Sequence, residues 1–118
     1  MNSIQLAPYQ KLMKDELARA ARLYGETNHS DHESYAVLKE EIEEALVEAD
    51  EITPLLERFW NYVKQNPAKL APELQTEHRN YKRRLLYHLQ THALQCAAEM
   101  IQVAAMCEKG MATLHGNV

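Results

Sequence analysis

The chain has 118 residues, which is enough for one domain and too few for two. Only 3 glycines and 4 prolines occur, while alanine, leucine, glutamate, lysine and glutamine are frequent, so the composition favours helices over strands. The formal net charge of −4 argues against specific nucleic-acid binding, and we expect neither a signal peptide nor a membrane-spanning segment. These features predict a single all-α domain over residues 1–118, built as a bundle of four to five helices.

Start and stop signals divide the chain into helices. Ser30 and Glu33 have the spacing of a capping box, and Thr53-Pro54 repeats a helix start. Gly25 and Gly110 are suited to helix stops. The expected helices cover residues 8–24, 30–51, 54–65 and 72–109, the last long enough to break before Leu85, and residues 1–6 and 111–118 are expected to be disordered.

The second helix is strongly acidic. Residues 39–50 carry six acidic side chains in twelve positions, within a pattern that is still amphipathic. On a helical wheel, Glu41, Glu44 and Glu48 fall together on one flank of the apolar stripe. Like charges three and four residues apart repel one another. The pattern therefore predicts a cation that neutralises this flank, with a merely solvated acidic face as the alternative.

The last helix carries a line of polar side chains. From Leu85 to Cys107 the residues are mostly leucine, alanine, methionine, isoleucine and valine, which is typical of a buried helix. Five polar residues lie within about 80° of one another at 3.6 residues per turn: His88, His92, Gln95, Glu99 and Gln102. Such a polar ladder must be satisfied by partner side chains, water, a metal or a substrate. We expect it to face the Glu41/Glu44/Glu48 flank.

Other features exclude several chemistries. His88 and His92 lack the further ligands and spacing of a zinc site, and there is no glycine-rich phosphate loop.

The basic segment 78–84 is expected to be an exposed, solvated face, with attraction of phosphate or of an acidic partner as the alternative. Cys96 and Cys107 are too far apart on one helix for a disulfide, so buried, reduced thiols in a cytoplasmic protein are expected.

The run Leu38–Ala45 resembles the E-E-x-x-E start of the all-α nucleotide pyrophosphohydrolases, the MazG-like group related to dimeric dUTPases. In that group a Glu-x-x-Glu pair and a later Glu-x-x-Asp pair hold Mg²⁺. Glu41 and Glu44 match the first pair, and Glu99 opens the second. Gln102 stands where the family has aspartate, and the interval between the two pairs is long.

The resemblance implies a MazG-like fold and a Mg²⁺ site, with Mn²⁺ as a substitute, held by Glu41, Glu44 and Glu99, with Gln102 as a neutral oxygen ligand. Glu48 would be a further ligand or would orient the attacking water. The implied reaction is hydrolysis of a nucleoside triphosphate to monophosphate and pyrophosphate, in a homo-dimer or homo-tetramer. The alternative is a non-catalytic helical protein that retains the fold for oligomerisation or interaction.

The apolar stripes also predict a core. We expect eight side chains to be largely buried: Leu38, Ile42, Leu46, Phe59, Trp60, Leu94, Ala98 and Ile101. The alanine-rich run 93–105 allows helices to approach closely, which favours a homo-oligomer.

Overall fold

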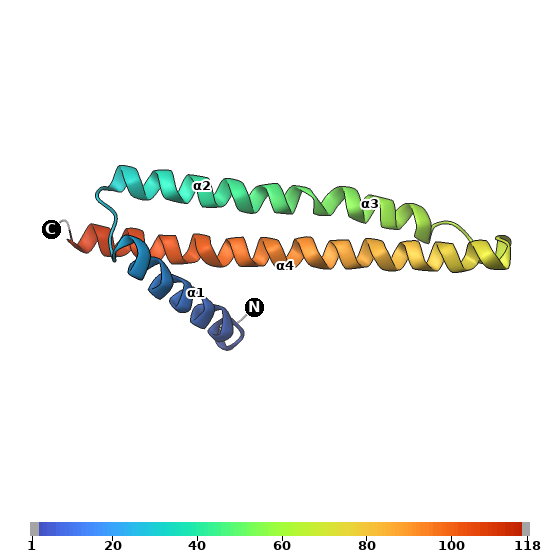
Figure 1. Ribbon diagram of the computed structural model, residues 1–118, viewed down its shortest axis with the longest axis horizontal. Coiled ribbons are helices and arrows are strands. Elements are labelled where there is room, and N and C mark those ends of the chain that lie inside the picture. The colour runs from blue at the N-terminus through green and yellow to red at the C-terminus, as the bar shows by residue number, and fades with distance from the viewer. Residues whose placement is uncertain (1–2, 117–118) are drawn as a thin grey trace. The chain divides into compact units, whose positions relative to one another are not determined.

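The computed structural model describes residues 3–116, which form α-helices joined by short connections (Figure 1). The elements are α1 Ser3–Tyr24, α2 Asp31–Asp50, α3 Ile52–Val63, the 3₁₀ turn η1 Pro67–Lys69 and α4 Pro72–Gly116. These residues contain no β-strand, which confirms the all-α class. Across the same residues no helix combines the length and the apolarity needed to traverse a lipid bilayer.

The end of α1 and the start of α2 follow the predicted signals. Gly25 has a φ of 89°, a left-handed conformation that glycine adopts readily, and its N–H donates to the carbonyl of Ala21 at 2.9 Å. Ser30 caps α2, because its Oγ accepts a hydrogen bond from the backbone N–H of Glu33 at 3.2 Å. Both signals are local, so the sequence alone was sufficient to find them.

The start of α1 differs from the prediction. The helix begins at Ser3 and contains Pro8, whereas the sequence predicted a start at Pro8 and disorder over residues 1–6. Pro8 has no backbone N–H to donate to the carbonyl of Ile4, yet the helix continues through this position. The predicted disorder is therefore wrong for residues 3–6, and residues 1–2 lie outside the described chain.

The number of separate helices is lower than predicted. Only Glu51 separates α2 from α3, and its φ of −74° and ψ of −19° are close to helical values. The predicted cap at Thr53 is absent, since α3 already begins at Ile52. If α2 and α3, which follow one another almost without interruption, are counted together, the described chain contains three helices rather than four to five.

The last helix also extends beyond its predicted end. It continues through Gly110 to Gly116 without a break before Leu85, so the predicted disorder is wrong for residues 111–116, while 117–118 lie outside the described chain. The cause is a tertiary contact. Thr113 is only 1% exposed, and its Oγ1 accepts a hydrogen bond from the backbone N–H of Asn28 at 2.8 Å. This bond holds the final turns of α4 in place. It joins residues far apart in the sequence, so no local sequence pattern predicts it.

The contacts divide the chain into two compact units, which we describe separately. Unit 1 comprises residues 1–45 and 97–118, and unit 2 comprises residues 46–96. In unit 1, α1, most of α2 and the end of α4 pack around small buried side chains: Ala20, Ala45 and Ala105. In unit 2, α3 packs on the first part of α4 around Leu55 and Leu85. The prediction of one domain stays a prediction.

The predicted core is wrong for the single chain. None of the eight side chains expected to be buried is buried, and Trp60 and Leu94 are 58% and 66% exposed. The buried apolar side chains are alanines in unit 1, whereas in unit 2 they are Leu55 and Leu85. Helical periodicity finds an apolar stripe, but it does not say which part of the stripe meets a neighbour.

Candidate metal centre

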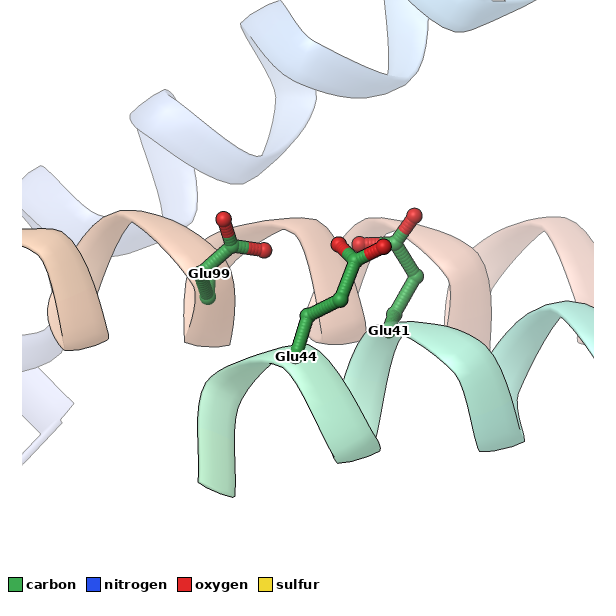
Figure 2. A group of neighbouring side chains, drawn as sticks. All are labelled: Glu41, Glu44 and Glu99. Carbon is green, nitrogen blue, oxygen red and sulfur yellow. The ribbon is translucent and has the colours of Figure 1, made fainter. Parts of the chain in front are cut away.

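Three carboxylates converge in unit 1. Glu41 and Glu44 lie three residues apart on α2, and Glu99 projects from α4 beside them (Figure 2). One oxygen of each carboxylate lies within 4.8 Å of one from each of the others. We call these three residues the carboxylate cluster. The convergence follows from antiparallel packing in unit 1, because Ser34 lies against Gly110 while Glu41 lies against Gln102.

The cluster makes ionisation of the Glu41 carboxyl group unfavourable. Glu41 is half-buried, and desolvation raises the pKa of its carboxyl group above the usual value. Repulsion from Glu44, and then from Glu99, raises this pKa further. A cation placed among the three carboxylates would offset both effects, because it would replace the lost hydration and screen the like charges.

Gln102 lies where the sequence placed it, beside the cluster. With its amide nitrogen toward the carboxylates, Gln102 donates hydrogen bonds to Glu41 Oε2 at 2.8 Å and to Glu99 Oε2 at 3.1 Å. This orientation satisfies the amide, because its nitrogen then faces acceptors. The predicted role as an oxygen ligand requires the opposite orientation. In this orientation Gln102 links two carboxylates, and its amide must rotate to present its oxygen to a cation.

Glu48 is not part of the cluster. It belongs to unit 2, where His92 Nδ1 donates to Glu48 Oε2 at 2.9 Å, and both side chains are 28% exposed. The carboxylate of Glu48, which was predicted to be catalytic, is thus hydrogen-bonded to His92 of the polar ladder. The expected pairing of ladder and glutamates occurs within each unit: His92 with Glu48 in unit 2, and Gln102 with Glu41 in unit 1. His88 and Gln95 are exposed.

A groove of about 440 Å³ adjoins the cluster in unit 1, with Glu41 and Gln102 in its wall. Arg19 and Lys109 also line it. Arg19 Nε donates to Glu16 Oε2 at 3.0 Å, and this bond lowers the pKa of the Glu16 carboxyl group. Lys109 is 6% exposed. The groove therefore brings two cationic side chains to the edge of the cluster.

The sequence did not indicate these groove residues. Arg19 and Lys109 are isolated cations on the first and last helices, and no motif links them. Asn28 in the connection after α1 also lines the groove, and its Oδ1 is buried without a hydrogen-bond partner within the described chain. Only the tertiary packing of unit 1 brings the three together.

Two further predictions need correction. His78 was expected on an exposed basic face, but it is 6% exposed and lines a pocket of unit 2. Cys107 was expected to be buried, but it is exposed, whereas Cys96 is half-buried. The remaining arginines of the basic segment, Arg79, Arg83 and Arg84, are exposed as predicted.

Comparisons of the chain with family models, with curated proteins and with solved structures find no match. Any assignment of function therefore depends on the residues themselves.

Proposed function

We propose that the protein is a Mg²⁺-dependent nucleoside triphosphate pyrophosphohydrolase with a MazG-like bundle. The observation that carries the proposal is the convergence of Glu41, Glu44 and Glu99 to within 4.8 Å. These are the residues that the sequence motif selects, and a motif alone does not place side chains from α2 and α4 together. The raised pKa of Glu41 supports a site that gains from a bound cation.

The donor set suits a hard cation. Three carboxylates provide anionic oxygen ligands, which Mg²⁺ prefers, and Mn²⁺ accepts the same ligands. Glu41, Glu44 and Glu99 would hold the ion, with Gln102 contributing its amide oxygen after rotation. A bound Mg²⁺ would neutralise phosphate charge and make a coordinated water more acidic.

The groove offers a place for the substrate. Lys109 would attract the phosphate chain, whereas Arg19 is already paired with Glu16, and a bound cation would offset the glutamates that line the groove. Tyr24, which also lines the groove and is 74% exposed, offers a ring face for a base. In the reaction, a water oxygen bonds to the α-phosphorus while the bond from that phosphorus to the bridging oxygen breaks. Nucleoside monophosphate and pyrophosphate leave. We assign Glu44, the exposed member of the cluster, to receive the proton of the water on the carboxylate oxygen that does not bind the ion.

Two observations favour a second candidate, a non-catalytic oligomerisation or interaction protein. Gln102 already satisfies Glu41 and Glu99 through hydrogen bonds, so the cluster can exist as a structural link between helices. In addition, many large apolar side chains remain exposed on the single chain, among them Leu12, Leu23 and Leu94. Such surface is typical of a chain that associates.

An activity assay separates the two candidates. Purified protein is mixed with each common nucleoside triphosphate and Mg²⁺, and pyrophosphate release is measured. We expect release that is lost with chelator and that falls at least about 100-fold in Glu41→Gln, since removing a metal ligand removes both charge and position. The control is Glu43→Gln, an exposed carboxylate on α2 outside the cluster, which should keep full activity. Absence of release with every nucleotide would favour the non-catalytic candidate.

A further inference from the structure

Unit 2 contains a pocket of about 460 Å³ that shares no residue with the carboxylate cluster. It lies between Tyr62 of α3 and one face of α4, on which His78, Tyr81 and Arg84 recur at three-residue intervals. The pocket combines a buried polar atom, two aromatic rings and a guanidinium group. Its properties follow from the basic segment, which the proposed function does not use.

His78 provides an unsatisfied polar atom in this pocket. The side chain is 6% exposed, and its Nε2 is buried without a hydrogen-bond partner among the described residues. Its ring lies 5.3 Å from that of Tyr62, measured between centroids. A buried nitrogen without a partner costs free energy that a ligand can recover, and an imidazole nitrogen can either donate or accept.

The rings and the guanidinium group define the rest of the ligand. Tyr62 and Tyr81 lie with centroids 4.5 Å apart and ring planes inclined by 30°, so the two rings stack on each other and offer the outer side of this stack to a flat ring. The Arg84 Cζ lies 5.5 Å from the centroid of Tyr81. Across residues 3–116 no carboxylate forms an ion pair with Arg84, so its charge remains available to an anion.

Glu77 and Arg84 give the two ends of the pocket opposite charges. It lines the same pocket next to His78, and it lies seven residues before Arg84, about 10 Å along a helix at 1.5 Å per residue. A carboxylate repels an anion and accepts N–H donors. The Glu77 end therefore suits the edge of a ring that carries N–H groups, and the Arg84 end suits a negative group.

We propose that this pocket binds a nucleoside monophosphate, independently of the carboxylate cluster. The base lies against the outer side of the Tyr62–Tyr81 stack, its edge meets Glu77 and His78 Nε2, and the phosphate meets Arg84. Inorganic phosphate lacks the ring and an unphosphorylated nucleoside lacks the charge, so each should bind more weakly than the complete ligand.

The test is a calorimetric titration of AMP, GMP, CMP and UMP into the full chain with EDTA present, which removes divalent cations from the measurement. At least one nucleotide should bind saturably, at least about tenfold more tightly than its nucleoside or inorganic phosphate. Arg84→Gln should weaken binding about tenfold, whereas Arg79→Gln, an exposed arginine of α4 outside the pocket, should not. The imidazole NMR signals of His78 should shift on titration.

Several results would overturn the proposal. These are no binding at millimolar nucleotide, equal weakening by Arg84→Gln and Arg79→Gln, or inorganic phosphate binding as tightly as the nucleotide. A fourth concerns a different occupant. If Tyr81→Ala dissociates an oligomer and leaves nucleotide binding unchanged, then the pocket is a contact between copies of the chain.

Discussion

At the scale of single residues, sequence patterns located the cluster but not its chemistry. Glu41, Glu44, Glu99 and Gln102 were selected by motif and helical periodicity, and the structure places all four together. The hydrogen bonds of Gln102 were not predictable, because they depend on the distance between two helices. The partner of Glu48 was not predictable for the same reason, since the periodicity that placed it near the ladder did not identify His92.

The raised pKa of Glu41 leads to a prediction about pH. Because the folded state holds the proton of Glu41 more tightly than the unfolded state, this group favours folding at low pH. That contribution is fully present below the ordinary glutamate pKa and is lost as the pH rises through the raised pKa of the folded state. We therefore compare the melting temperatures of wild type and Glu41→Gln in EDTA. The value for wild type minus the value for Glu41→Gln should fall as the pH rises from the acidic range to neutrality.

The thermal melts of the two proteins at several pH values test this, with Glu43→Gln as the control, which should follow wild type. A difference between wild type and Glu41→Gln that does not vary with pH would contradict the electrostatic description of the cluster. Cation binding must displace the same proton, so Mg²⁺ affinity should rise with pH across this range.

At the scale of helices, local signals succeeded at some ends and failed at others. Gly25 was recognised as a stop and has the positive φ that favours glycine. Gly110 was also predicted to end a helix, yet α4 continues through it. The difference is tertiary: Thr113 bonds to Asn28, and Ser34 packs close to Gly110, so this part of α4 is held against its neighbours.

These two glycines should respond in opposite ways to the same substitution. A Cβ at Gly110 would meet Ser34 Cβ and Oγ at 3.8 Å, which is ordinary contact, and alanine is the better helix former, so Gly110→Ala should stabilise the protein by about 0.5–1 kcal/mol. At Gly25 a Cβ would meet no atom within 4 Å, but the φ of 89° is unfavourable for alanine. Gly25→Ala should destabilise by about 1–2 kcal/mol.

Urea unfolding of both variants measures these changes. Destabilisation by Gly110→Ala would show that α4 does not continue as a helix at this position. Little effect of Gly25→Ala would show that the chain leaves α1 by another route.

At the scale of the whole molecule, the all-α class followed from composition, whereas the buried residues did not. Apolar stripes predicted a core of eight residues, seven of them large, yet the buried apolar residues of unit 1 are alanines, and Trp60 and Leu94 remain exposed. Sequence patterns show which residues favour burial, but not whether the covering surface belongs to the same chain.

We therefore predict a homo-dimer or homo-tetramer that covers part of this apolar surface and buries well over ~1,000 Å², the usual threshold for a specific interface. Light scattering at micromolar concentration measures the mass of the assembly. Trp60 is the only tryptophan, so its fluorescence reports directly on its surroundings. A monomer with solvent-exposed tryptophan emission would contradict the prediction and weaken the proposed MazG-like assignment.

The central claim is that the carboxylate cluster binds a divalent cation. The most direct measurement is a calorimetric Mg²⁺ titration of wild type, Gln102→Asp and Glu99→Gln, with and without a non-hydrolysable nucleotide. Wild type should bind weakly, because Gln102 brings no charge and its amide already bonds to Glu41 and Glu99. Nucleotide phosphates should strengthen binding by completing the coordination. Gln102→Asp should tighten Mg²⁺ binding about tenfold or more, and Glu99→Gln should weaken it by a similar factor. If both variants bind Mg²⁺ as wild type does, no cation binds among these carboxylates, and the cluster is a structural link between α2 and α4.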